Sequence, residues 1–291
     1  MQNDALLTDL AQCGSPETLL AAILKHHPGW CAPVAVETFA RSVGIVEIRD
    51  LKAEGFASAV IADFDRKKGV ILCAPGLSAQ RRRFAIAHQL GHFLLQGHPG
   101  DRQCTSRDLS ENRRDTAHRK EEMQANRFAA GLLVPKPWLV GFVDGLGKPT
   151  VAHLPMIAAA YEVSLEVAAS RYVDLTQALY AFILVKNGVV RFVIPSRTFP
   201  PLAIRPLDRA PAAVLAARPG DRIAWVPTDF RDWLVQSRDV RPPRMTMQIL
   251  SKESGLQIVM LFINAASERR ADEEAEKDAT ERPKFGRPRS R

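Results

Sequence analysis

The chain has 291 residues, of which 46% are hydrophobic and 25% are charged, and it carries a formal net charge of +8. This composition excludes a disordered or fibrous chain, and the length allows a sizeable core and suggests two domains. No apolar run reaches the roughly 18 residues that a membrane span needs. The basic balance permits contact with polyanions but does not by itself indicate a nucleic-acid function.

The N-terminus has no basic region followed by an apolar stretch, so we expect no signal peptide and a cytoplasmic location. The cysteines are scattered without CxxC spacing, which favours free thiols in a reducing compartment over a disulfide framework or a zinc knuckle. They are Cys13, Cys31, Cys73 and Cys104.

The first part of the chain predicts helices followed by strands. Ser15 and Pro16 form a typical helix start. Three β-prone runs then precede the motif described next, and we expect an antiparallel sheet whose edge strand can hold an extended peptide by main-chain pairing. The predicted helices are 4–13, 16–27 and 33–43, and the predicted strands are 45–51, 56–63 and 69–74.

The stretch 80–98 holds two histidines four residues apart, His88 and His92, in an apolar sequence that predicts a buried helix. Residues i and i+4 lie on one helix face, so both imidazoles can reach one metal ion. An isolated HxxxH pair is more simply interpreted as two histidines with ordinary partners. Here, however, Gln89 stands where the H-E-x-x-H motif of zinc peptidases has its general base.

Residues 97–120 are polar and aperiodic. They predict a loop over the site, and an insert without a role is an equal alternative. We expect His98 in this loop to be solvated, and neither His98 nor Cys104 to be a metal ligand.

A second helix is predicted over 121–134, where Glu122, Asn126, Ala129 and Leu133 form one stripe. The stripe directs the Glu122 carboxylate and the Asn126 amide at the same neighbouring element. Glu122 is therefore a candidate for the third ligand of the metal ion. A solvated charge run is the alternative interpretation of this glutamate.

Residues 150–175 predict two short helices with Ser164 as an N-cap, in a helix-turn-helix-like arrangement. The second helix offers only Arg171 as a cation that could read bases, so we prefer packing against the core to DNA binding.

Residues 178–264 are β-rich and contain the hairpin signal Asn187-Gly188. Trp225, Phe230 and Trp233 are interpreted as core or dimer contacts, not as a cofactor site. The predicted strands are 179–186, 189–195, 222–227, 245–250 and 256–263.

The two motif-bearing stretches together resemble the ImmA/IrrE family of bacterial zinc metallopeptidases. The chain reads Arg-Arg-Phe-Ala-Ile-Ala-His-Gln-Leu-Gly-His-Phe-Leu-Leu and later Glu-Met-Gln-Ala-Asn-Arg-Phe-Ala-Ala-Gly-Leu-Leu-Val-Pro. Family members have R-F-T-L-A-H-E-L-G-H-type and E-x-x-A-N-x-F-A-x-x-L-L-x-P-type helices. The resemblance covers residues 15–175 and implies that His88, His92 and Glu122 hold Zn²⁺.

The same resemblance implies further roles. Asn126 would orient a metal ligand by contacting it without binding the metal itself. Glu121 and His118 are lesser ligand candidates. The implied reaction is endopeptidase cleavage of a helix-turn-helix transcriptional repressor, which releases stress, phage or mobile-element genes. The sequence does not assign an oxyanion donor, for which His118, Tyr161 and Arg83 are candidates only.

Gln89 departs from the family pattern, because the family has Glu there as general base and an amide cannot accept a proton at neutral pH. The chain as written should therefore bind zinc and substrate and turn over poorly or not at all. Either the residue was replaced deliberately, which the intact remainder of the motif favours, or the protein is a natural pseudo-peptidase. The alternative function is a regulator that binds a repressor or DNA without proteolysis.

We therefore predict an α+β protein in four parts. Residues 1–148 form a zincin-like peptidase domain, and residues 149–177 a helix-turn-helix-like segment. Residues 178–266 form a β-rich α/β domain. Some members of the family carry a GAF-like sensor domain after the peptidase part, and this region is a candidate for one. Residues 267–291 form a charged, disordered tail. The expected partner is a protein substrate. Direct binding of nucleic acid is possible but not favoured, and we expect no contact with a membrane. The sequence does not predict the oligomeric state.

The tail has too little apolar surface to dock. Truncation after residue 266 should leave the melting temperature nearly unchanged in a thermal denaturation experiment. A fall of many degrees would show that the tail packs against a folded domain.

Overall fold

The computed structural model describes residues 4–110, 116–236 and 243–264, and the predicted tail lies outside these ranges. The chain divides into two compact units, Met1–Leu175 and Thr176–Arg291. Both contain a sheet, and the chain as a whole is α+β, as predicted.

The N-terminal unit begins with three helices, α1 (Asp4–Ala11), α2 (Pro16–His26) and α3 (Val36–Ser42). The predicted start of α2 is confirmed. The Ser15 hydroxyl accepts from the backbone N–H of Thr18, and the Thr18 hydroxyl accepts from the backbone N–H of Ser15. This capping box satisfies two donors that a helix start leaves open.

The sheet of this unit has the order β1-β3-β2-β4, with β1 (Ile45–Asp50), β2 (Ser58–Ala62), β3 (Gly69–Cys73) and β4 (Arg102–Cys104). The expectation of an antiparallel sheet is correct for β2–β3 and β2–β4 but wrong for β1–β3, which are parallel. The reason is that the chain after β1 crosses to the far side of β3 before β2 begins. Strand β4 comes from the stretch that was predicted to be only a loop.

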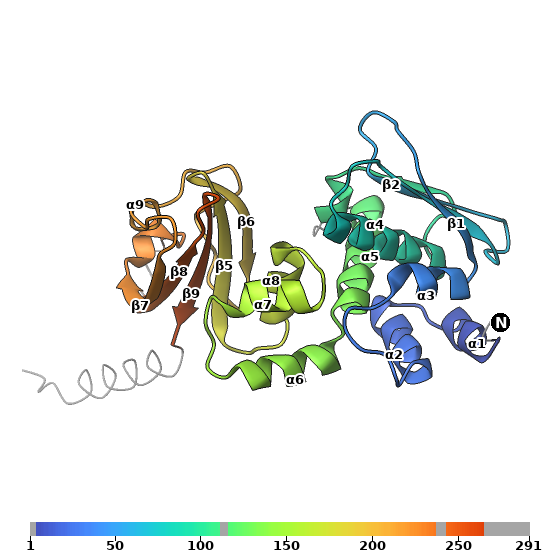
Figure 1. The fold of residues 1–291 in the computed structure, drawn as a ribbon, viewed down its shortest axis with the longest axis horizontal. Helices are drawn as coiled ribbons and strands as arrows, with labels where there is room; N and C mark the ends of the chain where they lie inside the picture. The colour runs from blue at the N-terminus through green and yellow to red at the C-terminus, as the bar shows by residue number, and fades with distance from the viewer. Residues whose placement is uncertain (1–3, 111–115, 237–242, 265–291) are drawn as a thin grey trace, which may run out of the picture. The chain divides into compact units, whose positions relative to one another are not determined.

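Two long helices lie under this sheet, α4 (Ala79–Leu94) and α5 (Ala117–Leu133). Helix α4 contacts β2 and β3 on one side and α5 on the other (Figure 1). Residues 85–93 are consequently all buried, as the apolar sequence predicted. The short helix η1 (Asp108–Ser110) contacts α5.

Helices α4 and α5 approach closely at Gly91. A Cβ atom at this position would lie 3.1 Å from the Cα of Ala125 and 3.2 Å from the ring of Phe128. A side chain here would require α5 to give way by a few tenths of an ångström, so Gly91 allows the close separation of the two helices.

The unit ends with α6 (Lys136–Leu146), α7 (His153–Ala160) and α8 (Leu165–Val173). The predicted cap of α8 is confirmed, since the Ser164 hydroxyl accepts from the backbone N–H of Val167. Helix α8 contacts α5, and Arg171 donates from Nε to the Val134 carbonyl at 3.0 Å. The one cation expected to read bases is therefore committed to packing, which supports the structural interpretation of this helix pair.

The C-terminal unit is one antiparallel sheet of order β6-β5-β9-β8-β7. Trp233 is fully buried in its core, as predicted, and donates from Nε1 to the Thr228 hydroxyl. A likeness to GAF domains stays a prediction. The elements are β5 (Leu179–Lys186), β6 (Val189–Pro195), α9 (Ala212–Leu215), β7 (Arg222–Thr228), η2 (Phe230–Asp232), β8 (Met245–Ser251) and β9 (Leu256–Ile263).

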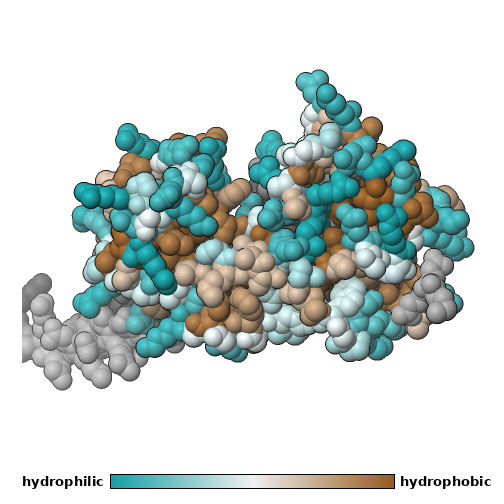
Figure 2. Space-filling view, viewed as in Figure 1, coloured by the Kyte–Doolittle hydropathy of each residue, from teal (hydrophilic) through white to brown (hydrophobic). Residues whose placement is uncertain are grey.

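Figure 2 shows hydrophilic residues over much of the face that it draws, with hydrophobic residues between them. None of the helices in the described part of the chain combines the length and the apolar character that a membrane span requires.

Gly91→Ala should force α4 and α5 apart. Overpacking of this kind usually costs about 1–3 kcal/mol, so urea denaturation should show a loss of stability of that order. Gly141→Ala in α6 is the matched control, because a Cβ there meets no atom within 4 Å. It should be neutral or stabilise by about 0.5–1 kcal/mol. Equal stabilities for the two variants would contradict the close-approach argument.

Candidate metal centre

Helix α4 places the two motif histidines against one another. His88 and His92 are both fully buried, and their Nε2 atoms lie 3.1 Å apart. Ser78 caps the helix by accepting from the backbone N–H of Arg81. The two imidazoles thus point at a common site from adjacent turns.

Helix α5 brings Glu122 to the same point. Its Oε2 lies 3.2 Å from His88 Nε2 and 3.4 Å from His92 Nε2, and its side chain is also fully buried. The structure therefore brings together the three residues that the sequence singled out as metal ligands.

A chain of hydrogen bonds determines which nitrogen of His88 carries the proton. Asn126 Nδ2 donates to the Asp108 carbonyl at 2.9 Å, which turns the amide oxygen Oδ1 towards His88. That oxygen lies 2.8 Å from His88 Nδ1 and can only accept, so Nδ1 carries the proton. His88 Nε2 therefore presents a lone pair, and Asn126 has the orienting position that the resemblance implied.

A similar chain acts on His92. His98 Nε2 lies 3.1 Å from Gln124 Oε1, and His98 Nδ1 lies 2.9 Å from His92 Nδ1. If His98 donates to the Gln124 oxygen, its Nδ1 accepts from His92 Nδ1–H, and His92 Nε2 is left with a lone pair. The expectation that His98 is solvated is wrong, because it is buried behind His92.

Burial favours the neutral state of two of these imidazoles, those of His92 and His98. It lowers the pKa of His92 to about 3, and it also lowers the pKa of His98. The Nε2 atoms of His88 and His92 and the Glu122 carboxylate therefore face one another in a site closed to solvent. Such a set of acceptors is unfavourable unless a cation lies among them.

A tetrahedral metal ion fits this set. Ligand atoms bound to zinc at about 2.0–2.1 Å are separated by roughly 3.3–3.4 Å. The separations of 3.1, 3.2 and 3.4 Å among His88, His92 and Glu122 are close to these values. The donor set therefore suits a divalent cation of the zinc class.

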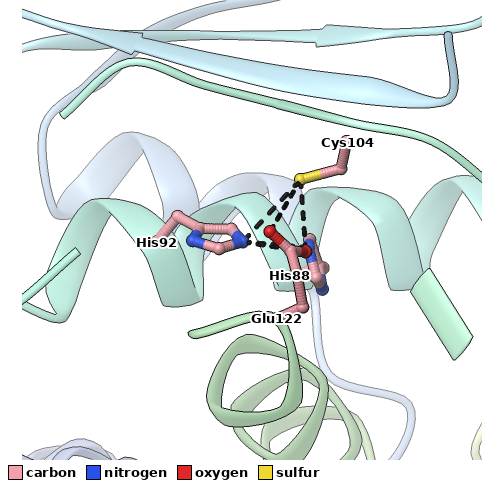
Figure 3. A group of neighbouring side chains, drawn as sticks. All are labelled: His88, His92, Cys104 and Glu122. Atoms are coloured by element: carbon pink, nitrogen blue, oxygen red, sulfur yellow. Dashed lines mark hydrogen bonds and ion pairs between the residues drawn. The ribbon is translucent and has the colours of Figure 1, made fainter. Parts of the chain in front are cut away.

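The structure adds a fourth residue, Cys104 of β4, which is fully buried (Figure 3). Its sulfur lies 3.5 Å from Glu122 Oε2 and 3.7 Å from His92 Nε2. The ligand atoms of all four residues lie within 4.8 Å of one another. Burial raises the pKa of this thiol in the absence of a cation.

Comparison with known protein families agrees with this geometry. Residues 46–172 match the family model described as the IrrE N-terminal-like domain. This stretch is therefore an IrrE N-terminal-like domain. The match runs from β1 into α8 and contains all four residues of the cluster. A search of curated proteins found no match.

Within the IrrE-type domain, Gln89 is buried beside the cluster. Its Nε2 donates to the Ser58 hydroxyl at 2.8 Å, and its Oε1 has no hydrogen-bond partner. The amide is thus anchored to β2 at the position where the family carries its base.

The lesser ligand candidates lie at the edge of the cluster. Glu121 pairs with Arg102, whose Nε also donates to Glu122 Oε1 at 2.9 Å. His118 Nδ1 is 3.8 Å from Glu122 Oε1, and its side chain is half exposed. Both are better placed to support Glu122 than to replace it.

Two of the oxyanion candidates have contacts elsewhere. Arg83 donates to the Val34 carbonyl and pairs with Glu162 at 3.6 Å. The buried Tyr161 packs edge-on against Phe142. His118, at the rim, is the candidate that the structure places near the cluster.

We expect one divalent metal ion per chain, held by His88, His92 and Glu122. Glu122→Ala should lose most of the bound metal, measured by elemental analysis of the purified protein. Glu121→Ala is the comparison variant, because it removes a carboxylate that pairs with Arg102 outside the cluster, and it should lose less metal than Glu122→Ala. Asn126→Ala should weaken the affinity by about 10–100-fold, as is typical when the partner of a ligand is removed. Undiminished metal in Glu122→Ala would exclude Glu122 from the site.

Proposed function

We propose that this protein is a zinc-dependent endopeptidase of the ImmA/IrrE type in its architecture, and that with Gln89 it binds its protein substrate with little or no cleavage. The observation that carries the proposal is the buried convergence of two imidazole lone pairs and a carboxylate beside residue 89.

His88, His92 and Glu122 would hold the zinc ion. When bound, zinc would polarise the scissile carbonyl and make water more acidic. Asn126 keeps His88 in the tautomer that ligation requires, and His98 would do so for His92 by accepting from its Nδ1–H. The protein's own part in this chemistry is therefore a fixed donor set in a site closed to solvent.

The missing function is proton transfer. A carboxylate at position 89 would take a proton from the attacking water and pass it to the leaving amine. The Gln89 amide has nearly the same shape, but it can only hydrogen-bond. Its contact with Ser58 holds the side chain in place, so the loss concerns the proton acceptor and not the local fold.

The substrate class follows from the family likeness. The proposed substrate is a helix-turn-helix transcriptional repressor, and its cleavage would release stress, phage or mobile-element genes in the cytoplasm. Direct DNA binding by α7 and α8 is not favoured, because Arg171 packs against α5.

A second candidate function is a regulator that binds a repressor without cutting it. Two observations favour it: the amide at position 89, and the Cys104 sulfur next to the site where a peptidase needs water. The codon for residue 89 in the source gene distinguishes the two, since a natural glutamine favours the regulator.

Gln89→Glu tests the proposal directly. General-base catalysis is typically worth about 10²–10⁴ in rate, so this variant should cut a cognate repressor and the present form should only bind it. The assay is incubation with candidate repressors from the same genome, followed by mass spectrometry of the fragments. A chelator should abolish the cleavage.

Because Cys104 lies beside the site, the double variant Gln89→Glu/Cys104→Ala is assayed in parallel. If both Glu forms bind zinc and the repressor yet neither cuts more than the Gln form, the endopeptidase proposal is wrong and the regulator takes its place.

A further inference from the structure

We propose that Cys104 is a fourth protein ligand of the zinc site, so that strand β4 closes the coordination position that a zinc peptidase keeps for water and substrate. This inference rests on the proposed binding of zinc by His88, His92 and Glu122. It changes the site from an open set of three ligands to a closed set of four.

Two separations of the sulfur match those of a zinc ligand. For Zn–S of about 2.3 Å and Zn–N or Zn–O of about 2.0–2.1 Å, a tetrahedral site separates sulfur from its neighbours by roughly 3.5–3.6 Å. Cys104 Sγ lies 3.5 Å from Glu122 Oε2 and 3.7 Å from His92 Nε2. The side chain is fully buried, as are those of the three proposed ligands.

Strand β4 holds the sulfur in place from its backbone. Cys104 is paired with Ser58 of β2, and its carbonyl accepts from the backbone N–H of Ala57 at 3.0 Å. Arg102 on the same strand pairs with both Glu121 and Glu122. The strand is thus attached to the sheet on one side and to α5 on the other, and the sulfur lies between them.

Residues 89 and 104 are linked through Ser58. Its hydroxyl accepts from Gln89 Nε2, and its backbone pairs with Cys104. A closed site has no water to deprotonate, so it needs no base at position 89. The amide and the sulfur are therefore consistent with each other, and both are characteristic of a zinc site that does not turn over.

The donor set also indicates how the site would open. Four protein ligands are typical of structural zinc sites, whereas catalytic sites keep one position open. In a four-coordinate site, a substrate carbonyl would need the position that the sulfur occupies. Because β4 has three residues, its detachment from β2 would break a short ladder and leave β2 and β3 paired.

X-ray absorption spectroscopy of the zinc-loaded full chain tests the inference. We expect one sulfur scatterer at about 2.3 Å and nitrogen or oxygen scatterers at about 2.0–2.1 Å. The sulfur signal should disappear in Cys104→Ser and Cys104→Ala. Cys73→Ser is the matched control, because Cys73 is equally buried and also pairs with Ser58, from β3.

Chelator competition gives a second measurement. Removal of a partner behind a ligand typically costs about 10–100-fold in metal affinity, so loss of a ligand in Cys104→Ala should weaken zinc binding by at least roughly tenfold. Cys73→Ser should bind as tightly as the unchanged chain.

The outcomes separate this inference from the proposed function. One zinc per chain with nitrogen and oxygen scatterers alone would overturn the role of Cys104 and leave the three-ligand site intact. A sulfur signal that survives Cys104→Ala would also overturn it. A chain that binds no zinc at all would overturn both proposals.

Discussion

The close approach of α4 and α5 at Gly91 is the constraint on which the site depends. The missing side chain lets the Cα of Ala125 lie 3.1 Å from where a Cβ would be. At that separation Glu122, on α5, comes within 3.2 Å of His88 Nε2 on α4. The ligands thus come from two helices whose distance is set by packing and not by the ligands themselves, which is the rigid support that a metal site requires.

The residues that contact the metal ligands on the side away from the metal site have defined roles of their own. Asp108 fixes the amide of Asn126, and that amide fixes the tautomer of His88. His98 lies behind His92 in the corresponding place, with the two Nδ1 atoms 2.9 Å apart. Burial keeps His92 neutral, so the protein sets imidazole nitrogens and a carboxylate at one point, where a bound cation would be stabilised.

Gln89 and Cys104 both bear on the chemistry of the site. Replacing a carboxylate by an amide removes the proton acceptor, and sulfur in the remaining coordination position would remove the water. Each alone would slow a peptidase. Both residues lie in the IrrE N-terminal-like domain, and both would act on the same step, the supply of an activated water.

The sequence determined the features that depend on local spacing. The i, i+4 repeat places His88 and His92 on one helix face, and the stripe on α5 selects Glu122 and Asn126, because helical periodicity acts over a few residues. The strands of the C-terminal unit were predictable for the same reason, from short runs of β-formers between turns.

Only the tertiary structure determined the conformation and the contacts of the described residues in 97–120. This stretch has no period, so nothing local showed that Arg102 and Cys104 form a strand on β2 or that His98 is buried behind His92. The pairing of Cys104 with Ser58 joins distant parts of the chain. The parallel β1–β3 pair has the same origin, because strand order depends on how the connecting chain crosses the sheet. Contacts of this kind are selected by packing of the whole unit, and that information is not contained in any one segment.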